Sequence, residues 1–106
     1  MAYKKNFAAW PPGRPYNIAA SQQVVYDNLE RSVAECADKA AMVFYETEIS
    51  YRELYDTVQR LASWLYHEAG IRKGDRVGIF SQNCPQYVIA YYATLCAGGV
   101  VVPMNP

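Results

Sequence analysis

The chain has 106 residues, which suits one small domain with a modest core and is too short for two. Ten basic and ten acidic side chains balance, so the composition argues against a protein that binds nucleic acid by neutralising phosphates. Three cysteines, an odd number without a C-x-x-C pair, argue against a disulfide framework or a zinc site and favour a reducing, cytoplasmic location; peripheral membrane attachment stays open.

The first twenty residues differ in character from the rest. Residues 1–20 are rich in proline and aromatic side chains and follow neither a helical nor a strand period, so we expect an extended arm. Lys4, Lys5 and Arg14 give its first fifteen residues a charge of +3 without any acid, and no apolar segment follows the two lysines. We therefore expect no secretory signal, and we expect the folded region to cover residues 21–106.

A helix and a hairpin are expected next. From Ser21 onward apolar side chains recur about every four positions, which predicts one amphipathic helix carrying Val25, Leu29, Val33 and Cys36. Two short β-prone runs follow it, and they predict a hairpin in which Ala41–Tyr45 pairs with Glu48–Ser50 across a turn at Glu46-Thr47.

The clearest local signal begins at Ser50. The order Ser-Tyr-Arg-Glu has the spacing of a capping box, in which the Ser50 hydroxyl and the Glu53 carboxylate each satisfy a backbone N–H at a helix start. Gly70 stands where a helix-ending glycine belongs. His67, the sole histidine, fits a structural or solvated role better than a chemical one. The apolar positions with helical spacing are Tyr51, Leu54, Tyr55, Val58, Leu61, Ala62, Leu65 and Tyr66.

The last 30 residues, Val77–Pro106, contain no charged side chain. Three explanations are open: the segment spans a membrane, it is a buried core element, or it is part of a larger domain whose covering elements are not in this chain. The strongest apolar run, Tyr87–Val102, has sixteen residues and is interrupted by glycines, whereas a span needs roughly 20 apolar residues. We therefore expect no transmembrane segment.

This charge-free segment reads as a βαβ unit. We expect a strand at Arg76–Phe80, a helix at Tyr87–Ala97 with Pro85 at its first position, and a strand at Val100–Val102. Strands joined in this way are parallel and buried on both faces, which explains the missing charges. The expected fold class is α/β: amphipathic helices, a β-hairpin and the first parallel βαβ unit of a larger sheet.

No catalytic constellation stands in the sequence, because no G-x-G-x-x-G or Walker loop follows either strand. The loop Ser81-Gln82-Asn83 could hold an anion at a helix start, but Asn83 as the helix cap is the simpler interpretation. Cys84 lacks a base placed by the sequence, so a nucleophilic role is disfavoured. Gly98-Gly99 stands at a helix end, the wrong pole for a phosphate. We assign no catalytic, cofactor-binding or metal-binding residue.

Four ordered blocks resemble the N-terminal region of the adenylate-forming acyl-CoA synthetases. The family pattern is roughly [IL]-[ST]-Y-x-E-L, K-G-D-R-V, N-x-P-x-[FY] and A-G-[AG]-x-x-V-P-x-N-P, and the resemblance covers residues 23–106. The arm Trp10–Tyr16 also looks like the leader of long-chain fatty acid–CoA ligases. One departure is the hairpin turn, where relatives commonly carry a glycine. The four blocks stand here at Ile49–Leu54, Lys73–Val77, Asn83–Tyr87 and Ala97–Pro106.

The resemblance implies an enzyme that activates a carboxylic acid with ATP and Mg²⁺ to an acyl-adenylate and then transfers the acyl group to coenzyme A. In such families the phosphate-gripping loop and the catalytic lysine follow the N-P motif, so we expect residues 21–106 to be the incomplete beginning of the large N-terminal AMP-binding domain. The chain alone is then expected to be inactive, to need the remainder of its own chain as a partner, and to self-associate.

Two alternatives stay open. The chain could be a free-standing small α/β binding or interaction module. It could also be a fragment of another adenylate-forming enzyme, such as an aryl-CoA ligase or a peptide-synthetase adenylation domain. The leader disfavours the latter.

Overall fold

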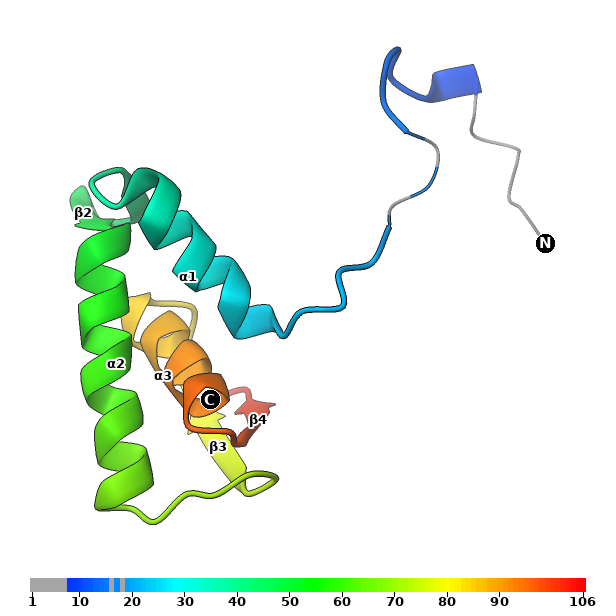
Figure 1. Cartoon of the computed structure of the whole chain (residues 1–106). Helices are drawn as coiled ribbons and strands as arrows, with labels where there is room; N and C mark the ends of the chain where they lie inside the picture. The colour runs from blue at the N-terminus through cyan, green and yellow to red at the C-terminus, as the bar shows by residue number, and fades with distance from the viewer. Residues whose placement is uncertain (1–7, 16, 18) are drawn as a thin grey trace.

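The structure is a computed structural model that describes residues 8–15, 17 and 19–106. These residues form three helices and four strands (Figure 1). The mixed α/β class expected from the sequence is confirmed. In chain order the elements are α1 (Val25–Cys36), β1 (Ala40–Phe44), β2 (Thr47–Ser50), α2 (Tyr51–His67), β3 (Arg76–Phe80), α3 (Pro85–Cys96) and β4 (Val100–Met104).

Helix α2 begins at the capping box that the sequence predicts. The Ser50 N–H donates to Glu53 Oε2 at 2.8 Å, and the Glu53 N–H donates to Ser50 Oγ at 3.2 Å. Beyond the end of the helix, Gly70 has a φ of +75°, and the Ile71 N–H donates to the Leu65 carbonyl at 2.9 Å. Gly70 therefore terminates helix α2 through a left-handed backbone conformation, as the sequence predicts.

The hairpin forms, but its turn lies one residue earlier than expected. Strands β1 and β2 pair antiparallel, and their last pair is Phe44 with Thr47. The turn residues are thus Tyr45 and Glu46, with φ of 45° and 66°, so the expected turn at Glu46-Thr47 is wrong. Positive φ at both positions is the signature of a two-residue type I′ hairpin loop. The β-branched side chain of Thr47 disfavours that region and suits a pleated strand.

The predicted βαβ unit is present at the C-terminal end. Strands β3 and β4 pair in parallel from Arg76 with Val100 to Phe80 with Met104. Helix α3 connects them and packs against one face of the pair (Figure 1). Strand β4 extends two residues further than expected and includes Pro103, which an edge strand tolerates because its missing N–H disrupts no further pairing.

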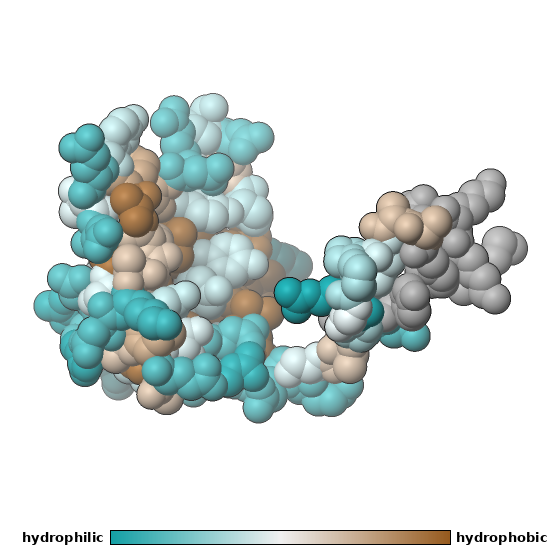
Figure 2. Space-filling model, turned by 90° about the horizontal axis from the view of Figure 1, so that it is seen from above, coloured by the Kyte–Doolittle hydropathy of each residue, from teal (hydrophilic) through white to brown (hydrophobic). Residues whose placement is uncertain are grey.

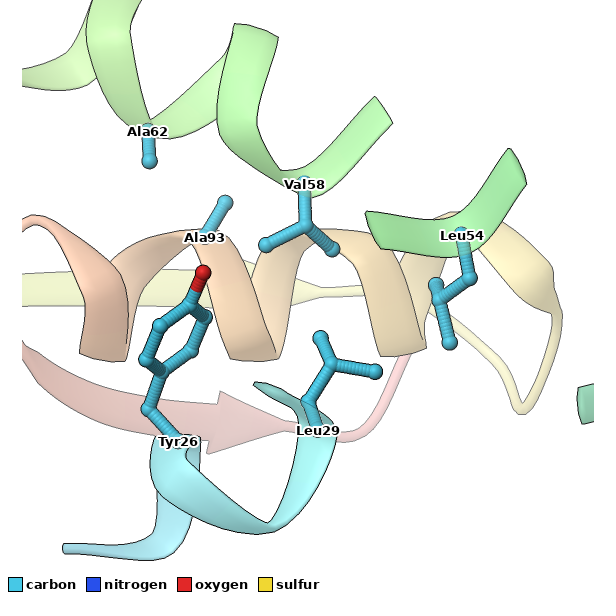
Figure 3. Close-up of a cluster of buried hydrophobic side chains, with 6 residues drawn as sticks. All are labelled: Tyr26, Leu29, Leu54, Val58, Ala62 and Ala93. Atoms are coloured by element: carbon cyan, nitrogen blue, oxygen red, sulfur yellow. The ribbon is translucent and has the colours of Figure 1, made fainter. Parts of the chain in front are cut away.

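The core lies where the three helices converge (Figure 3). Val58 on α2 is fully buried, and the small side chains of Ala62 on α2 and Ala93 on α3 point toward each other. Alanines at these positions allow the α2 and α3 backbones to approach closely. The buried cluster is Tyr26 and Leu29 from α1, Leu54, Val58 and Ala62 from α2, and Ala93 from α3.

A tyrosine hydroxyl links the helices inside this core. The side-chain amide of Gln59 donates to the Tyr26 hydroxyl oxygen, which joins α2 to α1. Burial raises the pKa of Tyr26 well above its ordinary value, and hydrogen bonds with Cys96 on α3 and Tyr55 on α2 raise it further. The hydroxyl therefore stays neutral and satisfied in the helix interface.

The N-terminal arm projects from the helical body (Figures 1 and 2). Within it the Trp10 Nε1–H donates to the Arg14 carbonyl at 3.2 Å, and the Arg14 N–H donates to the Pro11 carbonyl at 3.3 Å. Part of the expected arm, residues 1–7, 16 and 18, lies outside the described residues. The described part contains a local turn.

Candidate functional site

The loop between β3 and α3 is the strongest candidate for a site, because it follows the carboxyl end of a parallel strand. Ligands of open α/β sheets bind in this region, next to helix N-termini. The loop starts at Ser81, immediately after β3, and leads into Pro85, the first residue of α3. Its chemistry depends on which side chain caps the helix.

The cap is Cys84, so the expectation that Asn83 caps this helix is wrong. Cys84 has extended backbone angles, φ −155° and ψ 169°, and its carbonyl accepts from the Tyr87 N–H at 3.1 Å. Pro85 explains the position, because a proline drives the residue before it into the extended region that an N-cap requires. Asn83 is exposed and lies one residue outside the helix.

The Cys84 thiol is the one group in this loop with a changed acidity. Its Sγ lies 3.4 Å from Ser81 Oγ. That hydroxyl lowers the pKa of Cys84, and the N–H groups of Tyr87 and Gln86 at the helix start lower it further, against a small opposing effect of desolvation. At neutral pH a larger fraction of Cys84 is therefore ionised to the thiolate than in an ordinary cysteine.

The loop nonetheless lacks what nucleophilic catalysis needs. In the described part of the chain, no histidine or carboxylate bonds the Cys84 thiol. His67 is the last residue of α2, is exposed, and contacts the Tyr66 ring edge-on with 5.1 Å between ring centroids. A nucleophile without a base or an oriented partner supports no acyl transfer.

The loop is also a poor phosphate site. Its one hydroxyl, on Ser81, is already engaged within the loop, because Ser81 Oγ lies 3.0 Å from the Gln82 carbonyl oxygen and 3.4 Å from Cys84 Sγ. A cavity of about 280 Å³ lies beside the helix start. Its walls are mostly apolar and carry no cation; they are formed by Met42, Val43, Phe44, Asn83, Cys84, Pro85 and Val88.

Gly98 and Gly99 close helix α3, as the sequence predicts. Gly98 has a φ of +86° and donates its N–H to the Leu95 carbonyl at 3.0 Å. The Gly99 N–H donates to the Thr94 carbonyl at 2.9 Å. This pair of bonds is a Schellman motif. The two glycines therefore cap a helix and hold no ligand.

The family-like blocks Lys73–Val77 and Ala97–Pro106 contact each other at this cap. The Gly74 N–H donates to the Gly98 carbonyl at 3.0 Å, and the Val100 N–H donates to the Asp75 carbonyl at 2.7 Å. The Asp75 side chain also accepts the Arg72 N–H at 2.8 Å, which shapes the turn before β3. The sequence carries no signal for this contact, because it joins turns far apart in the chain.

A larger cavity, about 420 Å³, lies between α1, β1, α2 and α3. The polar side chains that α1 contributes to it are already engaged within that helix: Ser32 Oγ donates to the Asn28 carbonyl at 2.9 Å, and Asn28 Oδ1 accepts from Arg31 at 2.7 Å. Across residues 8–15, 17 and 19–106, no cluster of three or more potential metal ligands occurs. Over the same residues, no helix combines the length and apolarity that crossing a bilayer requires.

Comparison with known proteins places these elements in a family context. Residues 29–106 match the family described as AMP-binding enzyme. Over its full length the chain is 36% identical to a long-chain-fatty-acid–CoA ligase of Bacillus subtilis, of which it covers 19%. It is 37% identical over 73 residues to a crotonobetaine/carnitine–CoA ligase of Salmonella paratyphi A, covering 64% of this chain and 14% of that protein.

A solved structure shares the fold. The N-terminal subdomain of NpsA from Klebsiella oxytoca superposes on 76% of this chain with a TM-score of 0.71 and 32% identity, and the match covers 21% of that subdomain chain. The chain thus spans about a fifth of the length of these two matched proteins, the Bacillus subtilis ligase and the NpsA subdomain.

Proposed function

We propose that this chain, which belongs to the AMP-binding enzyme family, is the N-terminal portion of an ATP-dependent fatty acid–CoA ligase. The observation that carries the proposal is the match to a long-chain-fatty-acid–CoA ligase over all 106 residues, arm included. The four family-like blocks support it, because each folds into a defined element: a capping box, a turn, a helix start and a strand.

The proposed reaction has two steps. A fatty acid carboxylate attacks the α-phosphorus of ATP, which forms an acyl-adenylate and releases pyrophosphate, and the thiol of coenzyme A then displaces AMP to give the thioester. ATP, Mg²⁺ and coenzyme A are the cofactors and substrates of the whole enzyme. The role of residues 21–106 is to begin the large N-terminal domain, with residues 1–20 as an arm.

The described residues do not fit these groups by themselves. The cavities beside β1 and α3 are mainly apolar, and the described residues offer no cluster of potential metal ligands. We therefore place binding of ATP, Mg²⁺ and coenzyme A in parts of the protein that follow Pro106. We place the protein in the cytoplasm, in keeping with its three free cysteines, Cys36, Cys84 and Cys96.

A second candidate has a specific observation in its favour. NpsA, whose N-terminal subdomain matches at 32% identity, has been solved in complex with 3-hydroxyanthranilyl-AMSN and, joined to ThdA, as an artificially fused adenylation–PCP di-domain NRPS. A fragment of an aryl-acid-activating or peptide-synthetase enzyme is thus the alternative. Full-length coverage by the fatty acid ligase favours the first proposal.

The test is an ATP–pyrophosphate exchange assay on the complete product of the gene, followed by measurement of AMP release with coenzyme A. Exchange with medium or long fatty acids, and AMP release that needs coenzyme A, is expected. Exchange with aryl or amino acids instead would overturn the substrate class while leaving the family unchanged.

The same assay on residues 1–106 tests where the chemistry lies. We expect no exchange above background, because no phosphate-binding or acid–base group is assembled among the described residues. Exchange by the pure 106-residue chain would overturn this part of the proposal and favour a free-standing catalytic module.

A further inference from the structure

A groove of about 460 Å³ lies where the start of α1 meets the turn that closes α3. This volume falls within the range of small-molecule sites. Val24, Val25 and Tyr26 form its wall on the α1 side, and Leu95 contributes the wall on the α3 side. We call this feature the α1–α3 groove. The described residues form it by themselves, since its lining comes from positions 23–26, 73, 95, 98 and 99.

Two glycines line the groove with backbone alone. An added Cβ atom at Gly98 would lie 3.5 Å from Lys73 Cα, so the Lys73 backbone runs directly against the turn formed by Gly98 and Gly99. The Gly74 N–H bond to the Gly98 carbonyl, at 3.0 Å, holds the two segments together. The base of the Lys73 side chain is therefore fixed at the groove by its own backbone.

The α1 wall of the groove is apolar surface in contact with water. Val24 and Val25 are 65% and 53% exposed, although both are among the most apolar residue types. Removing such surface from water is favourable in proportion to the area covered. The groove therefore favours a ligand with an apolar body over a small hydrated ion.

Lys73 is the one charged residue that lines the groove. In the part of the chain that the structure describes, its ammonium group has no acidic partner, and the ion pair found there joins Arg52 to Asp38. Asp27, in the first turn of α1, does not line the groove. The Asp75 carboxylate already accepts a backbone N–H at 2.8 Å. The positive charge of Lys73 is thus available to a ligand.

We propose that the α1–α3 groove binds a carboxylate that carries an apolar chain, with the carboxylate at Lys73 and the chain against Val24 and Val25. One ammonium group balances one carboxylate, whereas a phosphate monoester carries close to two charges and needs more donors than this groove offers. An uncharged apolar molecule would leave Lys73 without a partner. The site goes beyond the proposed function, because it involves neither ATP nor coenzyme A.

The arm of a second copy is a poorer occupant, although its aromatic side chains would suit an apolar wall. Lys4, Lys5 and Arg14 give the first fifteen residues a charge of +3 without any acid. An arm docked in the groove would bring this charge toward Lys73, and like charges repel. Occupation by a second copy would also depend on protein concentration, which a titration detects.

The test is an NMR titration of the ¹⁵N-labelled 106-residue chain, followed through its backbone N–H signals at two protein concentrations. Octanoate is the probe, kept below its micelle-forming concentration. Octanol has the same chain without the charge, and acetate has the charge without the chain. Lys73→Gln removes the cation from the groove, and Lys39→Gln is the matched control, an exposed lysine outside it. Circular dichroism confirms that each variant folds.

Octanoate should shift the signals of the residues that line the groove, and the shifts should saturate at both protein concentrations. Octanol should bind more weakly, and acetate should give no saturable shift. Lys73→Gln should weaken octanoate binding by about threefold or more, the scale of an exposed ion pair, while Lys39→Gln leaves it unchanged.

Three results would overturn the proposal. Equal affinities for octanoate and octanol in the unaltered chain would show that the charge has no role, whether or not the variants fold. Shifts that spread over other exposed apolar surface without saturating would show that the groove is not a site. Signals of the groove residues that change with protein concentration before any probe is added would mean that a second copy occupies it. None of these results bears on ATP–pyrophosphate exchange by the complete product, so the proposed function is tested separately.

Discussion

The N–H of Gly74 donates to the carbonyl oxygen of Gly98 at 3.0 Å, which binds the turn before β3 to the turn after α3. Both glycines have positive φ, +90° and +86°. Strands β3 and β4 therefore begin next to each other, with Arg76 paired to Val100. The Val100 N–H donates to the Asp75 carbonyl at the start of this pairing. The conformation of two glycines thus sets the start of the parallel pair.

Replacing Gly98 by alanine should lower the free energy of unfolding by about 1–2 kcal/mol, the cost of left-handed backbone for a residue with a Cβ. The new Cβ would lie 3.5 Å from Lys73 Cα, an ordinary contact, so the penalty comes from the backbone. Gly98→Asn is the matched control and should cost less, because asparagine tolerates this region. Chemical denaturation measures both, and equal losses would contradict the backbone explanation.

Two leucines on α2 should differ in their contribution to stability. Leu54 is 4% exposed and lies in the buried cluster, whereas Leu61 is only partly buried at its edge. Leu54→Ala should cost about 2–5 kcal/mol, the usual range for a buried leucine. Leu61→Ala should cost less, since water already reaches part of its side chain. A larger loss at Leu61 in urea denaturation would mean that α2 presents a different face to the core.

The capping box should make the stability of α2 depend on pH. Ser50→Ala should cost about 0.5–2 kcal/mol at neutral pH as a lost N-cap. The backbone N–H and then the hydroxyl of Ser50 lower the pKa of Glu53 below its ordinary value. Stability from this carboxylate is therefore present above pH ~4.3 and is lost as the pH falls through the lower, folded-state pKa. Glu53→Gln should remove that part of the acid dependence in thermal melts at stepped pH; an unchanged acid profile would contradict it.

Local signals predicted the elements in which several cues agree. At α2 the cap, the apolar spacing and the final glycine all indicate the same helix, and the structure confirms it. The parallel β3–β4 pair was predictable because a helix joins its strands. The hairpin turn was wrong by one residue, because the sequence lacks the glycine that usually marks such a turn and Tyr45 looks like a strand residue.

The candidate site depended on details that the sequence conveys less directly. Asn83 is the better capping residue by type, but Pro85 fixes the residue before it as the cap, and that residue is Cys84. This signal was present in the sequence and outweighed the preference for asparagine. The Gly74–Gly98 bond had no such signal, because contacts between distant turns depend on how whole elements pack. Which residues bind ATP or the acyl group could not be predicted, since no charged or glycine-rich constellation occurs among these 106 residues.

The hairpin turn offers a stabilising substitution. Glu46 has a φ of 66°, which is unfavourable for a residue with a Cβ and natural for glycine at the second position of a two-residue turn. Glu46→Gly should raise the free energy of unfolding by about 0.5–1 kcal/mol after the flexibility of the unfolded glycine is counted. Glu48→Gly, within β2, is the control and should lower it by a similar amount. A loss from both substitutions would argue against the left-handed turn.

Cys84 should be more reactive toward iodoacetamide at pH 7 than Cys36, another half-buried cysteine of the chain. Alkylation consumes the thiolate, and a lowered pKa leaves more Cys84 in that form at neutral pH. The Cys36 thiol instead donates to the Ser32 carbonyl at 3.2 Å. Because the Ser81 hydroxyl is the largest cause of the shift, Ser81→Ala should slow alkylation of Cys84, whereas Ser32→Ala should not.

The alkylation rate of Cys84 should rise less steeply with pH than that of an ordinary thiol, which ionises near pH ~8.5. Peptide-resolved mass spectrometry over a pH series gives both rates in one sample. If Ser81→Ala left the Cys84 rate unchanged, the amide groups of Gln86 and Tyr87 at the start of α3 would be sufficient to lower the pKa. If Cys84 and Cys36 reacted equally at pH 7, neither the hydroxyl nor the helix start would stabilise the thiolate, and the loop after β3 would have no special chemistry.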